Sequence, residues 1–434
     1  MAVDSRIDIT LLGATGFVGR LTARHLYRRC RQEGLTFAIA GRNRERLEAL
    51  AQELVQAASP ERSEERIQES DDRADPPVIR VASTDDATAL ARLARESSVL
   101  CSTVGPYARL GTEVVATCVQ EQADYCDLTG EVQWMRRMID RFDETAQEQG
   151  VRIIHAAGFD SIPSDLGVLL AQTRLREIHG HPAGQLRLRV HRQAGGVSRG
   201  TLDSMVQLVR EAARDPGIRE FLKDPHSLEP GWTPPGRRAP RPRWRDAASG
   251  EWTVPFFMEE VNRRVVYRSN ALTGYPWGRE FDYREIFLLP RGGRGFLTAL
   301  VVRVLSRIGP ALIAFPPTRA LISTTLFPKP GEGPKVAREE GGNFEVRIED
   351  PETGQSVVSV AADRDPGYGA TAIMLGETAI LLCQTRAAER GQEGRRATGM
   401  GGRPQGGVLT PAAALGHELA ERLTRAGVRF TVEL

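Results

Sequence analysis

Short apolar runs alternate with helical patterns along the first third of the chain. Three such runs lie at residues 7–12, 37–40 and 78–83, and a fourth lies within residues 97–111. Each run ends in a turn of glycine or polar residues, and the segments between the runs carry apolar residues at helical spacing. Two more strands are expected within residues 111–131 and 150–158. This strand–helix order predicts an α/β fold with a Rossmann-type, doubly wound parallel sheet.

After residue 158 the pattern changes to short segments in which apolar residues alternate with polar ones or run together. Three of these segments predict strands, at residues 185–192, 344–350 and 356–363. They indicate a mixed or antiparallel sheet with helices on one face, and so a second, α+β domain. Residues 411–434 predict an amphipathic helix followed by a short strand.

We therefore expect three parts of the chain. Residues 1–158 form the Rossmann domain, and residues 159–387 form an α+β domain for substrate binding or dimerisation. Residues 388–434 form a flexible linker and a C-terminal segment that packs back near the Rossmann domain. Polar or Pro/Arg-rich stretches, which predict solvated surface segments, occupy residues 56–77, 229–250 and 388–407.

Glycine recurs at every third position in the sequence GATGFVG, directly after the first expected strand. A strand that turns abruptly into a helix needs one glycine at the turn, a second where amides approach a phosphate, and a third where helix and strand pack closely. The helix N-terminus then attracts a pyrophosphate. The alternative is a purely steric need for glycine. The expected cradle comprises Gly13, Ala14, Thr15, Gly16, Phe17, Val18 and Gly19.

The second expected strand ends at Gly41, Arg42 and Asn43. In NAD-specific folds an acidic residue near this place binds the ribose 2′-hydroxyl, and such a residue would repel a 2′-phosphate. A guanidinium instead binds a phosphate through charge-assisted hydrogen bonds, so the segment favours NADP(H). The alternative is an ordinary surface arginine in an arginine-rich chain. The segment after the fourth strand adds Thr103, Val104 and Gly105 to the expected cofactor site.

Composition excludes several classes of function. The 434 residues carry a formal net charge of +2, which gives no electrostatic reason to expect a nucleic-acid partner. The 5 cysteines form no C-x-x-C pair and the 7 histidines form no H-E-x-x-H pattern. We therefore expect no metal site and no disulfides, in a cytoplasmic protein without a signal peptide.

Candidate catalytic residues follow the strands of the predicted sheet. Tyr107 lies just past the fourth strand, where a nicotinamide is expected, and is the first candidate proton donor. Asp127 and Asp160 close the next two strands and would orient water or bind substrate. Each has a structural alternative, such as a packing ring for Tyr107 and a helix cap for Asp160. The tyrosine–lysine pair of short-chain reductases is excluded, because no lysine follows Tyr107 or Tyr125 four residues later.

Residues 296–315 form an apolar stretch that has the length of a membrane span but is interrupted by Arg303, Arg307 and Pro310. On a helix these residues share one stripe, which is typical of an interfacial helix rather than a spanning one. We expect this helix to contact the plasma membrane peripherally or to cover a lipid-sized pocket, with its arginines toward anionic head groups. The alternative is a core helix, or the interface of a homodimer, with arginines facing solvent.

Five motifs together resemble the saccharopine dehydrogenase-like oxidoreductases: GATGFVG, AGRN, STVGPYARLG, DYCDLTGE and GFDSIPSDLG. Within that family the chain is most similar to the branch of the trans-acting enoyl reductases. The sequences GYGATAIMLGETA and GGVLTPAAALG extend the resemblance to the C-terminus. The resemblance implies an NADP-binding Rossmann domain joined to a mixed α/β domain.

These features predict an NADP(H)-dependent oxidoreductase that reduces an enoyl C=C bond or a carbonyl group of a hydrophobic, lipid-like substrate. Two alternatives stay open. One is a lipid- or membrane-associated nucleotide-binding protein with little turnover, since no clear catalytic constellation is visible. The other, which the family resemblance implies, is an amino-acid dehydrogenase related to saccharopine reductase.

Overall fold

A parallel sheet of seven strands forms one half of the protein. The computed structural model describes residues 6–58, 75–194, 199–233, 243–315, 317–318, 341–391 and 404–434. Within these residues the strand order of this sheet is β12-β6-β5-β4-β1-β2-β3. Its strands are β1 (Ile7–Leu12), β2 (Phe37–Gly41), β3 (Val78–Val81), β4 (Ser97–Ser102), β5 (Asp124–Asp127), β6 (Arg152–Ile154) and β12 (Gly407–Leu409).

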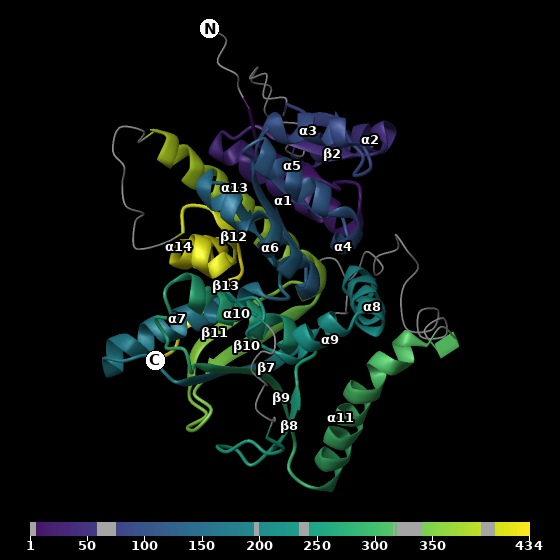
Figure 1. Ribbon diagram of the computed structural model, residues 1–434. Coiled ribbons are helices and arrows are strands. Elements are labelled where there is room, and N and C mark those ends of the chain that lie inside the picture. Colours follow the sequence, from purple (N-terminus) through teal and green to yellow (C-terminus); the bar gives the residue numbers. More distant parts are fainter. Residues whose placement is uncertain are drawn as a thin grey trace, which may run out of the picture.

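Helices connect the strands of this sheet in the expected alternation. They are α1 (Phe17–Glu33), α2 (Arg44–Ala58), α3 (Ala87–Arg95), α4 (Tyr107–Leu110), α5 (Thr112–Gln120) and α6 (Val132–Glu148). All paired strands run parallel, so the predicted Rossmann-type sheet is confirmed. Figure 1 shows this half in the upper part of the molecule.

A mixed sheet of six strands forms the other half, in the order β13-β11-β10-β7-β9-β8. Most neighbouring strands pair antiparallel, whereas β7 and β9 pair parallel. The predicted second sheet is thus confirmed as a mixed one. Its strands are β7 (Gln185–Ala194), β8 (Trp252–Pro255), β9 (Asp282–Leu289), β10 (Asn343–Glu349), β11 (Ser356–Ala362) and β13 (Arg429–Val432).

The helices of the second half and of the C-terminal segment complete the described chain. They are α7 (Ile162–His179), α8 (Arg199–Arg214), α9 (Pro216–Lys223), α10 (Glu259–Leu272), α11 (Gly293–Ala314), α13 (Thr371–Gly391) and α14 (Pro411–Arg425), with a π-helical turn η2 (Pro366–Ala370). Parts of the predicted surface segments, at 59–74, 234–242 and 392–403, fall outside the described residues. In the described part of the second segment Asp246 is buried and pairs with Arg187, so that part is not a solvated surface loop throughout.

The C-terminal segment contributes to both sheets. Strand β12 pairs with β6 at the edge of the parallel sheet, with Val408 opposite Ile153. Strand β13 instead pairs with β11 in the mixed sheet. The sequence did not predict β12, because a strand of three residues is too short to show a periodic pattern. The predicted domain boundaries stay a prediction.

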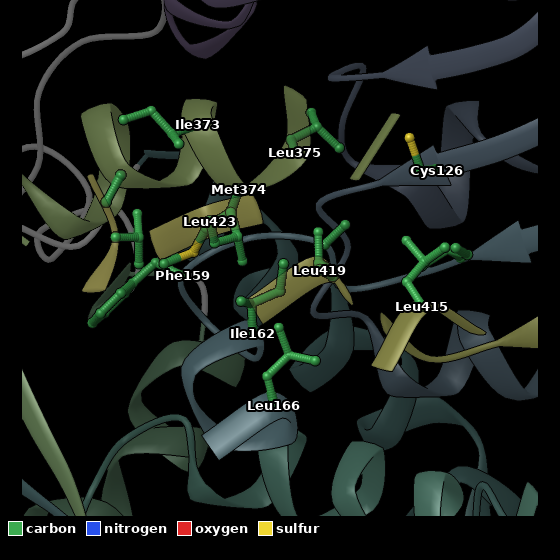
Figure 2. Close-up of a cluster of buried hydrophobic side chains, with 14 of the residues drawn as sticks. Cys126, Phe159, Ile162, Leu166, Ile373, Met374, Leu375, Leu415, Leu419 and Leu423 are labelled. Carbon is green, nitrogen blue, oxygen red and sulfur yellow. The ribbon is translucent and has the colours of Figure 1, made fainter. Parts of the chain in front are cut away.

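Helices α7, α13 and α14 pack together in one apolar core. Figure 2 shows Ile162 and Leu166 of α7 facing Leu419 and Leu423 of α14, with Met374 of α13 beside them. All five side chains are buried. Burying each of them contributes roughly 1.5–3 kcal/mol relative to leaving it exposed, so this core is a large part of what holds the C-terminal segment in place.

A buried ion cluster fixes α13 against α1. The Glu377 carboxylate accepts hydrogen bonds from His25 Nε2 at 2.7 Å, from Arg29 Nε at 2.9 Å and from Arg422 of α14. The helices approach so closely that a Cβ at Gly376 would lie 2.6 Å from the His25 ring. Burial alone would raise the pKa of Glu377, but the hydrogen bond from His25 and the surrounding charges outweigh it and lower the pKa to about 2.

We predict that Glu377→Gln lowers the free energy of unfolding at pH 7 by about 2–3 kcal/mol. Because the folded-state pKa of Glu377 lies below its ordinary value of 4.5, its contribution is present above pH 4.5 and is lost as the pH falls toward 2. Urea unfolding at pH 7 and pH 3 measures this difference, which should be smaller at pH 3.

The matched control is Glu53→Gln, which removes a carboxylate that also pairs with arginines of α1 but is partly exposed. A surface pair of this kind is worth less than about 1 kcal/mol. An equal decrease in the free energy of unfolding for the two variants at pH 7 would show that the Glu377 cluster stabilises the protein no more than a surface ion pair does.

Candidate functional site

The glycine turn between β1 and α1 has the predicted geometry. Gly13 adopts a φ of +87°, which favours glycine, and a Cβ at Gly19 would lie 2.1 Å from the Gly13 carbonyl oxygen. Gly16 is exposed and precedes α1 without a side-chain cap. The first-turn amides of α1 are therefore available to a ligand that approaches the turn.

Arg42 lies exposed just past the end of β2. Among the described residues its guanidinium has no hydrogen-bond or ion-pair partner. The side chain of Asn43 caps the start of α2, where its Oδ1 accepts a hydrogen bond from the Arg46 amide at 2.9 Å. The buried Gly41 lies near Thr15, whose Oγ1 would be 3.8 Å from a Cβ at Gly41. The end of β2 thus presents a free cation next to the glycine turn.

The segment after β4 closes the turn from the other side. Thr103 Oγ1 donates a hydrogen bond toward the Gly13 carbonyl oxygen at 3.2 Å, and the Thr103 amide donates to Leu12 at 3.0 Å. The Val104 side chain would be 2.7 Å from a Cβ at Gly13. Gly105 is exposed and leads from the turn into a cavity. The predicted cofactor residues therefore lie together at the carboxyl edge of the sheet.

A cavity of about 250 Å³ lies next to this turn. Val18, Thr103 and Gly105 form its nucleotide-side wall. The opposite wall comes from α8, α10 and the residues around them, and is largely apolar: Met205, Leu208, Phe257, Met258 and Val261. Among the described residues that line it there is no lysine or arginine. The cavity thus joins the glycine turn to an apolar surface from the second half of the protein.

The structure does not favour Tyr107 as a proton donor. Its ring lines the cavity and stacks on Trp134, with centroids 5.6 Å apart. Its hydroxyl, however, donates to the Ser102 carbonyl at 3.1 Å and accepts from the Leu128 amide at 3.3 Å. Burial raises the pKa of Tyr107 well above its ordinary value. The hydroxyl is therefore committed to the backbone.

Asp127 is fully buried and does not line the cavity. Its carboxylate accepts hydrogen bonds from His155 Nδ1 at 2.9 Å and from the Thr129 amide at 3.0 Å. These contacts tie the end of β5 to the end of β6, under the cavity floor formed by Thr129 and Ala156. Asp127 thus holds Thr129 and Ala156 in place and does not itself contact the cavity.

Asp160 is the predicted catalytic residue that reaches the cavity with a free side chain. It lines the cavity, is partly buried, and has no hydrogen-bond partner among the described residues. It does not cap α7, which begins at Ile162 after Ser161. Burial raises the pKa of Asp160 from 3.8 to about 6. A carboxyl group of this kind can exchange a proton with a ligand near neutral pH.

Sequence reasoning missed two residues that shape the site. His155 holds Asp127, and Glu131 accepts hydrogen bonds from the Tyr107 amide at 2.7 Å, the Ala108 amide at 3.0 Å and the Ser204 hydroxyl at 2.8 Å. Glu131 therefore starts α4 and also attaches α8 to the cavity rim. His155 directly follows β6 and Glu131 lies four residues after the end of β5, positions that could have drawn attention to them, but their partners are distant in sequence.

Curated relatives are similar to the chain over nearly its whole length. A protein of Mycobacterium tuberculosis that is provisionally named a trans-acting enoyl reductase is 35% identical over 443 residues, covering 98% of this chain and 97% of that protein. A trans-acting enoyl reductase of Mycobacterium ulcerans is 34% identical over 447 residues, with 98% of each chain covered. No model of a known protein family matches the chain.

Solved structures resemble the chain more weakly. Apo saccharopine dehydrogenase (L-Glu forming) of Saccharomyces cerevisiae is 14% identical with a TM-score of 0.47, covering 98% of this chain and 99% of that one. An alcohol dehydrogenase of Thermococcus sibiricus in complex with 5-hydroxy-NADP is 13% identical with a TM-score of 0.24, covering 34% of this chain and 74% of that one.

We predict that Gly16→Val abolishes nucleotide binding while the protein still folds. The backbone at Gly16, with φ −72° and ψ 167°, is open to valine, and the nearest atom to a Cβ there is the Gly13 oxygen at 3.3 Å. The branched side chain would occupy the space above the first-turn amides. Calorimetric titration with NADPH and a thermal melt measure the two effects.

The matched control is Gly184→Val, where no atom lies within 4 Å of an added Cβ. This variant should bind NADPH like the unmodified protein. NADPH binding by a folded Gly16→Val protein would mean that the phosphates bind elsewhere.

Proposed function

The chain belongs to the family of the trans-acting enoyl reductases, and on this premise we propose that it is an NADP(H)-dependent oxidoreductase that reduces a C=C or carbonyl group of a hydrophobic, lipid-like substrate. The observation that carries the proposal is the cavity that joins the glycine turn to an apolar wall. Such a cavity brings a cofactor at the turn and an apolar ligand into contact.

The residues at the sheet edge fit an NADP(H) cofactor. The close approach at Gly13 and Gly19 leaves no room for side chains where a pyrophosphate would meet the first-turn amides of α1. The free guanidinium of Arg42 suits a 2′-phosphate, which it would bind by charge-assisted hydrogen bonds. An NAD-specific site would place a carboxylate there instead.

The cavity wall favours an apolar substrate over an amino acid. An amino dicarboxylic acid needs cationic partners for its carboxylates, and the described lining contains no lysine or arginine. The cavity instead offers apolar side chains together with the polar groups of Thr129, Asp160, Gln193, Ser204 and Glu260, of which the two ionisable ones are acidic. This composition supports a lipid-like ligand with one polar functional group.

Reduction requires a hydride on one atom of the double bond and a proton on the other. A bound nicotinamide supplies the hydride. In this chain the proton falls to Asp160, because its carboxyl group faces the cavity, lacks a partner among the described residues and has a pKa of about 6. Burial of this carboxyl group raises its pKa and so keeps it largely protonated below that pH.

We predict that the protein binds NADPH more tightly than NADH, and that Arg42→Asp removes or reverses this preference. Losing the charge-assisted hydrogen bonds should weaken NADPH binding by about 10- to 100-fold. Titration of both cofactors into both proteins gives the four dissociation constants. Arg92→Asp, which changes an exposed arginine on α3, is the control. Equal affinity of the unmodified protein for NADPH and NADH would contradict the assignment of Arg42.

Steady-state NADPH oxidation tests the proposed reaction. We expect oxidation with long-chain 2-enoyl thioesters, and none with glutamate or aminoadipate semialdehyde. Within this assay Asp160→Asn should lower kcat about 100-fold or more. Because the acid form of Asp160 is the active one, the rate of the unmodified protein should fall as the pH rises through about 6.

The Asp160→Asn variant should lack this pH-dependent decrease, whereas the exposed Asp140→Asn variant should keep it. Unchanged rate and pH profile in Asp160→Asn would assign the proton to another group. Binding of NADPH without turnover of any acyl substrate would favour the nucleotide-binding protein over the reductase. Turnover of the amino acids would favour the amino-acid dehydrogenase.

A further inference from the structure

Helix α11 turns its large apolar side chains outward. Figure 1 shows the helix at the lower right, at the edge of the second half. Its exposed side chains include Phe296, Leu297, Leu300, Val301, Val304, Leu305, Ile308 and Leu312. Leu297 and Leu305 are 60% and 53% exposed. A helix of a globular protein normally buries such residues and exposes its polar ones, so this apolar face marks an interaction surface.

The opposite stripe of α11 attaches the helix to the protein. It consists of Gly295, Ala299 and Arg303, which are buried at helical spacing. A Cβ at Gly295 would lie 1.8 Å from the Pro290 carbonyl oxygen, so the helix starts in close contact with the end of β9. Arg303 Nη2 donates to the Thr253 carbonyl oxygen at 3.0 Å. These contacts hold the apolar face outward.

The position of Arg303 differs from the one expected from the sequence. The sequence placed Arg303 and Arg307 together on an outward cationic stripe, but Arg303 is 4% exposed and its guanidinium lies over the Trp244 ring at 4.4 Å. Arg307 is exposed, as expected. The arginine that anchors the helix and the arginine that faces outward therefore have separate roles.

The surroundings of the apolar face are cationic and aromatic. Helix α11 contains no aspartate or glutamate, while Arg291, Arg294 and Arg307 are exposed on or beside it. At its N-terminal end Phe296 contacts Trp252, with ring centroids 5.0 Å apart. Tryptophan and arginine side chains beside an exposed apolar stripe are characteristic of segments that lie at the surface of an anionic bilayer.

We propose that α11 docks the protein on the surface of an anionic lipid bilayer. The apolar face would enter the acyl region while the exposed arginines meet lipid head groups. The helix lies on the bilayer rather than across it, since no helix in the described part of the chain is long and apolar enough to span a membrane. Pairing with a second copy is disfavoured, because two such faces would bring like charges together without acidic partners on α11.

Docking would place the cavity close to the lipid. Helix α11 packs against α8, and α8 carries Met205 and Leu208 of the cavity wall. If the proposed reductase function holds, a hydrophobic substrate would then have a short path from the bilayer to the site. The docking itself does not depend on that reaction.

Flotation with vesicles tests the proposal. We expect the protein to float with vesicles of phosphatidylcholine mixed with phosphatidylglycerol, and to bind pure phosphatidylcholine vesicles more weakly. Replacing Leu297 and Leu305 with glutamine should lower the partition coefficient about tenfold for each change. Arg294→Glu with Arg307→Glu should abolish the preference for the anionic vesicles.

Two matched controls carry similar changes elsewhere on the surface. Ile178→Gln alters an exposed apolar residue of α7, and Arg425→Glu alters an exposed arginine of α14. Both should float like the unmodified protein, and all variants should keep the same NADPH affinity. No flotation with either vesicle would overturn the proposal. So would a dimer in analytical ultracentrifugation that Leu297→Gln dissociates, because a second copy would then cover this face.

Discussion

The contact between α1 and α13 is the constraint on which the candidate site depends. Glu377 is buried between His25 and two arginines, one of them from α14. These ion pairs hold η2, the turn before α13, against the start of α1. There Tyr368 packs edge-on against Phe17, with ring centroids 4.8 Å apart. Thr371, at the start of α13, then lines the cavity and accepts a hydrogen bond from the Phe159 amide at 3.1 Å. The cavity therefore exists because residues more than 300 positions apart are held together.

Most polar groups near the cavity are used to build it. Tyr107 and Asp127 are bound to the backbone and to His155, and Glu131 joins α4 to α8. Buried polar groups need such partners, since an unsatisfied one is costly. Asp160 differs because it faces the cavity with a raised pKa. This division separates the residues that hold the site from Asp160, which has no hydrogen-bond partner in the described part of the chain.

The features that could be predicted from the sequence are those that depend on a local pattern of residues. The glycine turn, the parallel strands and the place of Arg42 follow from short segments whose geometry is set by neighbouring residues. The roles of Tyr107 and Asp127 could not be predicted in this way, because Glu131 and His155 are brought to them by the packing of separate strands. The orientation of Arg303 depends likewise on Thr253 and Trp244, which lie 50 and 59 residues before it. Strand β12 was too short to show a pattern.

In the proposed reaction a nucleotide bound at the glycine turn meets an apolar ligand in the adjacent cavity. Transfer of deuterium from NADPH labelled at the transferable C4 position tests this most directly, with mass spectrometry of the product formed from a long-chain 2-enoyl thioester. We expect a saturated acyl product that carries one deuterium from the cofactor. Consumption of the labelled NADPH without deuterium in the acyl product, or no saturated product at all, would contradict it.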